Sequence, residues 1–239
     1  MISAEATADF LETLWRQGQT IDALPDDLRP ADADEALAVQ SAYIARYPSC
    51  GWKIGTTSDG GWLAAPLRGE PLPGSASLAG NMPPAVEVEV ALTLGASLLA
   101  GSTEDQARAA IRSFHLAFEL FGSRYKQPKA VDASSVLADN LNNAGVIVGD
   151  ARLPAEAQAT EITIDFHRDG ADAGRHHAPW PDDGFASGLI WLADYAAKRG
   201  KPLSAGDIII TGARIGPVPL QRGARYEARS SLGTLAFTT

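Results

Sequence analysis

The segment Ala85-Val-Glu-Val-Glu-Val-Ala-Leu-Thr-Leu94 decides the fold prediction, because it is typical of a β-strand that carries two acidic side chains. Successive side chains of a strand point to opposite faces, so Glu87 and Glu89 share one face and the intervening valines share the other. Two neighbouring carboxylates repel each other unless a cation lies between them, and oxygen ligands favour Mg²⁺, Mn²⁺ or Ca²⁺. The alternative is that both glutamates face solvent on a half-exposed strand.

The composition is that of an ordinary folded protein. With 239 residues, 45% of them hydrophobic and 21% charged, the chain suits one large domain or a main domain with a small helical appendage. A net charge of −9 without any cluster of basic residues predicts no binding to nucleic acid. Neither a signal peptide nor a membrane-spanning apolar run is recognised, and Cys50 has no cysteine partner within the chain. We therefore predict a cytoplasmic protein with no membrane partner.

Residues 1–50 are predicted to form an N-terminal helical region. Ser3 is a suitable cap for a helix that runs to about Gln17, and residues 32–47 carry apolar side chains at helical spacing. Residues 51–239 are predicted to form a single β-rich catalytic unit. Within it, residues 58–82 are rich in turn-forming residues, which favours an irregular loop.

Short strands alternate with helices in the rest of the chain. Thr103-Glu-Asp-Gln106 has the form of a capping box, which predicts a short helix to about Ser113 and then a strand to Phe121. Helices are also expected at residues 132–140 and 184–199, and strands at 144–148, 162–166, 207–212, 225–229 and 234–237. His176 and His177 are expected in an exposed turn. The predicted class is α+β, with a β-rich core and helices packed outside it.

Two further residues join the candidate site. Glu119 lies in the apolar run Phe114-His-Leu-Ala-Phe-Glu-Leu-Phe121, and a third oxygen ligand would leave roughly three positions of an octahedral ion for substrate and water. Lys53 is flanked by bulky apolar residues, so its pKa could be lowered for proton transfer, or its charge could hold a substrate anion. A lysine that snorkels to the surface is the alternative. Arg124 and Asp139 are expected to form an ion pair.

Six segments together resemble the 2-keto-4-pentenoate hydratase and 4-oxalocrotonate decarboxylase group of the fumarylacetoacetate hydrolase superfamily. In chain order they are Gly51-Trp-Lys-Ile-Gly-Thr-Thr-Ser58, Glu87-Val-Glu89, His115-Leu-Ala-Phe-Glu119 with Ser123-Arg124, Ala138-Asp-Asn140 leading to Gly145, Trp191-Leu-Ala193 and Gly206-Asp-Ile-Ile-Ile-Thr-Gly212. Each is weak alone, but their order covers about residues 35 to 239.

The resemblance implies a mixed β-roll or barrel core, a homo-oligomer, and Mg²⁺ or Mn²⁺ bound by Glu87, Glu89 and Glu119. It implies a 2-oxo or 2-hydroxydienoic acid as substrate, with Lys53 moving or positioning a proton while the metal stabilises the developing enolate. Asp139 matches a family position near the substrate, which makes it a further catalytic candidate. The candidates for substrate binding are Arg124, Thr211, Gly212 and Arg214.

The chain departs from the family pattern at several places. Gly122 stands where an aspartate is expected, Leu141-Asn-Asn143 follows the Asp-Asn pair, and Ile215 stands where a threonine is common. The 58–82 stretch also looks shortened. Because of these changes, neither the choice of substrate nor catalysis follows from the resemblance.

The leading interpretation is a hydratase that adds water to a 2-hydroxy-2,4-dienoate in aromatic catabolism. Decarboxylation of a 2-oxo-3-enedioate and hydrolysis of an acylpyruvate would use the same metal ligands, and Arg214 would suit a second substrate carboxylate. A different class of interpretation is a non-catalytic partner in a hetero-oligomer. Retention of Lys53 and three clustered glutamates argues against that class.

Overall fold

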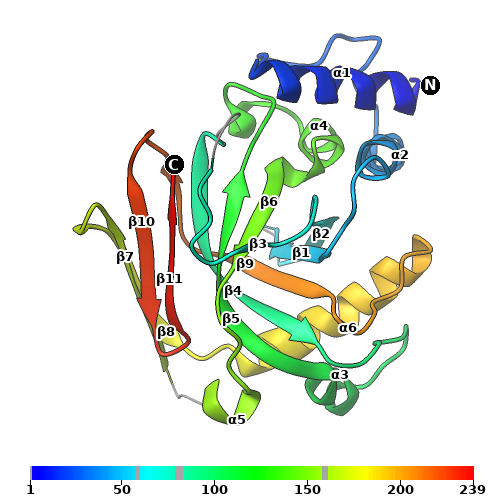
Figure 1. Ribbon diagram of the computed structural model, residues 1–239. Coiled ribbons are helices and arrows are strands. Elements are labelled where there is room, and N and C mark those ends of the chain that lie inside the picture. Colours follow the sequence, from blue (N-terminus) through cyan, green and yellow to red (C-terminus); the bar gives the residue numbers. More distant parts are fainter. Residues whose placement is uncertain (1, 58–59, 79–82, 158–160) are drawn as a thin grey trace.

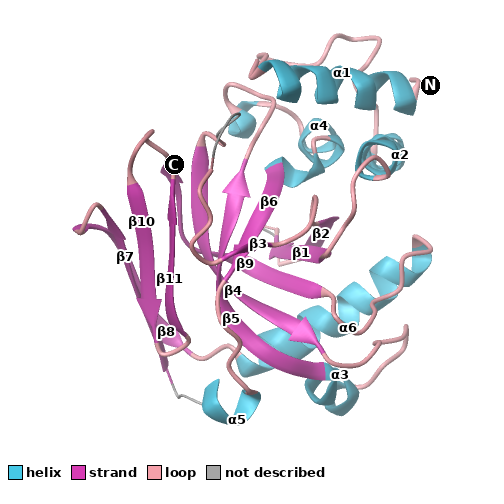
Figure 2. Ribbon diagram, viewed as in Figure 1, coloured by secondary structure: helices cyan, strands magenta, loops and turns pink. Residues whose placement is uncertain are grey.

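The computed structural model describes residues 2–57, 60–78, 83–157 and 161–239, which form two β-sheets with helices around them (Figure 1). The larger sheet has the strand order β2-β1-β9-β4-β5-β6-β3, and the smaller has the order β11-β10-β7-β8 (Figure 2). The larger sheet contains β1 (Gly51–Thr56), β2 (Trp62–Pro66), β3 (Leu72–Pro73), β4 (Ala85–Leu94), β5 (Ile111–Phe121), β6 (Asn143–Val148) and β9 (Ile208–Pro219). The smaller contains β7 (Glu161–Arg168), β8 (Ala171–Pro179), β10 (Arg225–Ser230) and β11 (Gly233–Thr238).

The helices lie outside the sheets. They are α1 (Ala4–Gln17), α2 (Ala33–Ile44), α3 (Glu104–Ala110), α4 (Ala133–Ala138), α5 (Pro154–Ala157) and α6 (Asp182–Lys198), with 3₁₀ turns at Pro128–Ala130 and Asn140–Asn142. The larger sheet is mixed, because β1 runs parallel to β9 and β3 parallel to β6 while its other neighbours are antiparallel. The predicted α+β class with a mixed β-rich core is confirmed.

Strand β4 has the two faces that its alternation predicts. Val86, Val88 and Val90 are fully buried in the main hydrophobic core, and Glu89 on the other face is 1% exposed. The core lies between the two sheets, where the Phe118 ring of β5 meets the rings of Phe166 at 5.8 Å and Phe237 at 5.0 Å. One face of β4 and β5 therefore anchors the fold, and the opposite face is left for the acidic side chains.

Helices α1, α2 and α4 pack together at one end of the molecule, above the larger sheet in Figure 1. Ser3 accepts a hydrogen bond from the Ala6 amide at the start of α1, and Gly18 ends this helix in a left-handed conformation. A second hydrophobic cluster joins Leu11, Tyr43 and Ala138 across the three helices. The N-terminal helices are thus attached to the segment that precedes β6.

Some local predictions were wrong. The 58–82 segment is not one irregular loop, because β2 pairs with β1 and β3 pairs with β6; residues 58–59 and 79–82 lie outside the described residues. His176 and His177 lie in β8 and pair with β7, so they are not in a turn. The helix expected to reach Asn140 ends at Ala138, and β9 continues to Pro219. In the three strand segments, pairing with a neighbouring strand decides the structure, and local sequence does not encode that pairing. No helix of the described ranges is long and apolar enough to cross a membrane.

Candidate metal centre and substrate pocket

Three carboxylates meet on the face of the larger sheet opposite the main core. Glu87 and Glu119 are direct partners across β4 and β5, and Glu89 lies two residues further along β4. One oxygen of each side chain lies within 4.8 Å of the others. They line a pocket of about 470 Å³ that is also lined by Lys53, Leu141, Asn142, Thr211, Gly212 and Arg214, among others. The structure thus brings the three predicted ligands together with Lys53.

Strand β1 delivers Lys53 to these carboxylates. Gly51, at the start of β1, lies so close to β9 that a Cβ atom would be 1.9 Å from the Ile208 carbonyl oxygen, and its φ of +146° also suits glycine. Two residues later the Lys53 Nζ donates to Glu119 Oε1 at 2.6 Å and to the Leu141 carbonyl at 3.1 Å. The side chain is 13% exposed, so Lys53 is a buried ammonium and does not snorkel to the surface.

Burial and neighbouring charges raise the pKa of Glu87, Glu89 and Lys53 in the metal-free pocket. Burial raises the pKa of Glu87 to about 7, with the Glu119 charge as the next cause, and the same two causes raise the pKa of Glu89 well above its usual range. Burial lowers the pKa of the Lys53 ammonium, but the Glu119, Glu89 and Glu87 carboxylates more than compensate, and the pKa is raised. Of the roles that the sequence left open for Lys53, a lowered pKa is contradicted, because the three carboxylates raise the pKa in the metal-free pocket.

The carboxylate cluster fits a divalent cation. Glu119 is fully buried, and its Oε2 atom has no hydrogen-bond partner among the described residues. Its Oε1 atom is already occupied by Lys53 and by the Asn143 side-chain amide at 2.9 Å. A buried carboxylate oxygen without a partner is costly. The three carboxylates around one point form the hard oxygen donor set that Mg²⁺, Mn²⁺ and Ca²⁺ prefer.

Strand β9, which lies between β1 and β4 in the larger sheet, supplies a further part of the pocket wall. The Gly212 amide donates to Glu89 Oε2 at 2.7 Å, and Thr211 Oγ1 donates to the Val90 carbonyl at 2.7 Å. The Arg214 guanidinium donates from Nη1 to the carbonyls of Thr211 and Gly212, and from Nη2 to Thr211 Oγ1. Burial lowers the pKa of Arg214, and the Glu89 charge opposes that effect. These three predicted substrate-binding residues all line the carboxylate pocket.

Arg124 and Asp139 lie elsewhere. Both side chains are fully buried, and the Arg124 Nε donates to Asp139 Oδ1 while the Arg124 backbone amide donates to Asp139 Oδ2 at 3.0 Å. The Arg124 Nη2 also donates to the Asp139 carbonyl at 2.8 Å. Neither residue is among the described residues that line the carboxylate pocket. Their geometry suits positioning of the chain that follows Asp139 rather than contact with a substrate.

The chain that follows Asp139 holds two groups that the sequence did not reveal. Asn140, Leu141 and Asn142 have φ values of 52°, 50° and 63°, which turn the Leu141 carbonyl toward Lys53. Asn143 then donates to Glu119 and accepts from the Arg68 amide at 3.1 Å. The Asn-Leu-Asn-Asn run was a detectable signal, because asparagine tolerates the left-handed region better than most residues. The leucine in that region gives no such signal.

Two departures from the family pattern lie outside the pocket lining. A Cβ atom at Gly122 would be 2.6 Å from the Trp15 ring and 2.5 Å from Ala144 Cβ, so α1 occupies the space of the expected aspartate side chain. Ile215 packs against the main core and contacts the position of Gly174 in the smaller sheet. Gly122 and Ile215 therefore bear on how elements pack, and neither is among the described residues that line the carboxylate pocket.

A mixed-sheet fold and an acidic pocket suited to a divalent ion define the class of protein. No family model matches the chain. The 2-keto-4-pentenoate hydratase 1 of Dechloromonas aromatica is 32% identical over 256 residues, which cover 95% of this chain and 93% of the relative. The solved 4-oxalocrotonate decarboxylase of Pseudomonas putida G7, complexed with magnesium and adipate, has a TM-score of 0.85 at 22% identity and covers 98% of this chain and 96% of its own.

A more distant fold neighbour is fumarylpyruvate hydrolase of Pseudomonas aeruginosa in complex with Mn²⁺ and pyruvate. Its TM-score is 0.59 at 14% identity, with 80% of this chain and 90% of that chain covered. The chain belongs to the family of the 2-keto-4-pentenoate hydratases, and it has the fold of the solved 4-oxalocrotonate decarboxylase and fumarylpyruvate hydrolase.

Proposed function

We propose that this protein is a divalent-metal-dependent hydratase that adds water to a 2-hydroxy-2,4-dienoate, with Mg²⁺ or Mn²⁺ held by Glu87, Glu89 and Glu119. The observation that carries the proposal is the buried cluster of three carboxylates around one point, with Lys53 hydrogen-bonded to one of them. The relative at 32% identity is named for this activity. A place in aromatic catabolism and assembly as a homo-oligomer belong to the same proposal.

The charge of the pocket suits a substrate with one carboxylate. Among the described residues that line it, the anions are the three glutamates and the cations are Lys53 and Arg214. Fully ionised, this set carries one net negative charge, which a divalent ion converts to one net positive charge. A monocarboxylate neutralises the pocket, whereas a dicarboxylate leaves a buried excess of negative charge. This balance favours a dienoate over the enedioate of a decarboxylase.

Lys53 and Arg214 have separate roles in the proposed hydration. A bound divalent ion supplies Lewis-acid stabilisation of negative charge on the substrate oxygens. Lys53 points its ammonium into the same pocket, and Glu119 and the Leu141 carbonyl hold two of its three N–H donors. The remaining proton on Nζ is available for transfer to C5 of the dienol, and the proton that the 2-hydroxyl loses returns the amine to its ammonium form. The resulting 2-oxo tautomer keeps one double bond, to which water then adds. Arg214 supplies the positive charge that complements the substrate carboxylate.

Decarboxylation remains the second candidate, because the fold neighbour with a TM-score of 0.85 is named a decarboxylase. The test incubates the protein and Mg²⁺ with 2-hydroxypenta-2,4-dienoate and, separately, with a 2-oxo-3-enedioate. Loss of dienol absorbance is followed together with CO₂ release. The proposal expects hydration of the dienoate without CO₂, and faster turnover of the dienoate than of the dicarboxylate. Turnover of the dicarboxylate alone, with CO₂ released, would replace the hydratase by a decarboxylase.

A further inference from the structure

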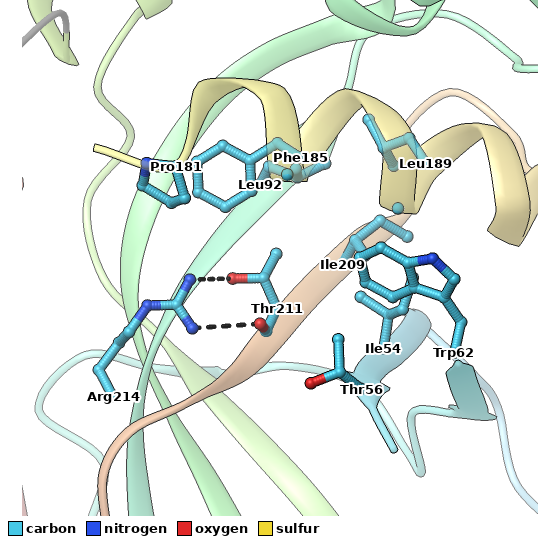
Figure 3. Close-up of a pocket in the computed structure, with 12 residues that line it drawn as sticks. Ile54, Thr56, Trp62, Leu92, Pro181, Phe185, Leu189, Ile209, Thr211 and Arg214 are labelled. Atoms are coloured by element: carbon cyan, nitrogen blue, oxygen red, sulfur yellow. Dashed lines mark hydrogen bonds between the residues drawn. The ribbon is translucent and has the colours of Figure 1, made fainter. Parts of the chain in front are cut away.

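A second cavity adjoins the carboxylate pocket. It has a volume of about 240 Å³ and lies between helix α6 and strands β1, β4 and β9 (Figure 3). The two cavities share five lining residues, which are Ile54, Thr56, Trp62, Thr211 and Arg214. A molecule with its chelating end at the carboxylates therefore has an adjoining space for its distal end.

The walls of this second cavity are mainly apolar. Phe185 and Leu189 of α6 face Leu92 and Ile209 of the sheet, and Trp62 closes one side (Figure 3). Arg214 is the only charged residue among the described residues that line it. Three hydrogen bonds hold its guanidinium to Thr211 and Gly212. Because Arg214 complements the substrate carboxylate in the adjoining pocket, a second ionised group in this cavity would lose its hydration without a cation of its own, whereas an apolar group would contact the apolar walls.

Gly188 forms part of the wall on the α6 side. A Cβ atom at this position would lie 3.3 Å from Ile54 Cδ1 and 3.3 Å from two atoms of the Trp62 ring. These distances are tighter than ordinary contacts, so even one methyl group would narrow the cavity. Glycine in a helix interior is destabilising relative to alanine, and at Gly188 it leaves open the space beside Ile54 and Trp62.

We propose that this cavity binds an uncharged, apolar substituent at the distal end of the substrate, and that Gly188 sets its size. The inference rests on the proposed function and specifies its substrate class. A cavity of about 150 Å³ holds benzene. The volume here therefore accommodates a phenyl-sized group or an alkyl chain of roughly six carbons.

The test measures binding rather than turnover. Titration calorimetry with Mg²⁺ present compares the saturated 2-oxo acids 2-oxobutanoate, 2-oxohexanoate, 2-oxooctanoate and 2-oxodecanoate with the dicarboxylate 2-oxoadipate. We expect affinity to rise about fourfold per added methylene until the cavity is full. We also expect 2-oxohexanoate to bind more tightly than 2-oxoadipate, which has the same number of carbons.

Variants of α6 locate the effect. Gly188→Leu is expected to weaken 2-oxooctanoate binding at least tenfold and to leave 2-oxobutanoate binding within about twofold. Gly188→Ala should show a smaller loss, and its gain in helix propensity keeps the chain folded if the leucine variant does not fold. Ser187→Ala, at an exposed position of the same helix, is the matched control and should behave as wild type.

Affinity that does not change with chain length, preference for 2-oxoadipate, or an unaffected Gly188→Ala variant would overturn the inference. The hydratase assay is scored separately. A rising affinity with chain length in a protein that turns over no dienoate would leave the apolar cavity standing and remove the proposed reaction. Hydration of dienoates without any dependence of affinity on chain length would support the proposed reaction and remove the apolar cavity as a substrate site.

Discussion

Glu119 accepts hydrogen bonds from Lys53 and Asn143 on Oε1, while its buried Oε2 has no partner among the described residues. Its neighbour across the strand pair is Glu87, whose pKa is raised by burial and by the Glu119 charge. A proton on one of these carboxyls would let it donate a hydrogen bond to the other. One proton shared between Glu87 and Glu119 provides a hydrogen bond for these two carboxyls and leaves Glu89 without one from it. A divalent ion satisfies all three carboxylates at once, which is the reason to test metal binding directly.

Millimolar Mg²⁺ is expected to stabilise the wild-type protein, and Glu87→Gln is expected to remove that effect. Binding at one hundred times the Kd is worth about 2.7 kcal/mol, and a chain of this size gains roughly 2–4 °C in Tm per kcal/mol. Thermal unfolding followed by circular dichroism measures the shift. Glu161→Gln, at an exposed position of β7, should retain it. Absence of a shift in wild type with either Mg²⁺ or Mn²⁺ would contradict the metal site.

Lys53→Met is expected to lower kcat about 10²–10⁴-fold while the Mg²⁺-dependent shift in Tm persists. The reason is that the substitution removes the proton on Nζ and leaves all three carboxylates in place. Steady-state kinetics and thermal unfolding measured on the same preparation separate the two properties. Lys126→Met, which removes an exposed lysine paired with Asp22, is the control. A Lys53→Met protein with unchanged kcat would show that this ammonium has no part in the reaction.

At the scale of elements, the connection between α4 and β6 links the N-terminal helices to the site. Trp15 of α1 lies against Gly122 and near the Arg124 guanidinium, which holds Asp139 at the end of α4. The residues after Asp139 then place the Leu141 carbonyl and the Asn143 amide beside Lys53 and Glu119. Packing far from the pocket thereby fixes two groups within it.

Asp139→Asn is expected to destabilise the protein by about 3–5 kcal/mol, because it leaves the Arg124 charge buried without a counter-charge. Urea unfolding followed by tryptophan fluorescence measures the change. The matched control is Asp165→Asn, which breaks the exposed pair with Arg175 and should cost at most about 1 kcal/mol. Equal effects of the two substitutions would show that the Arg124–Asp139 pair does not hold this connection.

At the scale of the whole molecule, the sequence predicts local elements better than their neighbours. Alternation and capping residues identify β4, α1 and α3 because those signals lie within a few positions of each other. The parallel pairing of β1 with β9 joins residues more than 150 positions apart, and no local pattern encodes it. The alternation of side chains along a strand predicted that Glu87 and Glu89 share one face. That Lys53 lies beside them was expected only from the family resemblance. The left-handed Leu141 followed from neither.

The stability of the metal-free molecule should carry the signature of the acidic pocket. The pKa of Glu87 is raised from 4.5 to about 7, so between these values the folded state holds a proton that the unfolded state has lost. Unfolding free energy therefore falls as pH rises through this window, and Glu87→Gln removes that contribution. The metal-free variant should gain stability relative to wild type between pH 5 and pH 8.

Comparing the two proteins cancels the titration of distant groups such as His176, whose lowered pKa acts in the opposite direction. Urea unfolding at pH 5, 6, 7 and 8 in the presence of a chelator measures the difference. Saturating Mg²⁺ at pH 8 should reverse the order, because the ion stabilises three ionised carboxylates in wild type and finds only two in the variant. A stability difference that is constant across pH would mean that Glu87 is not held near neutrality by its neighbours.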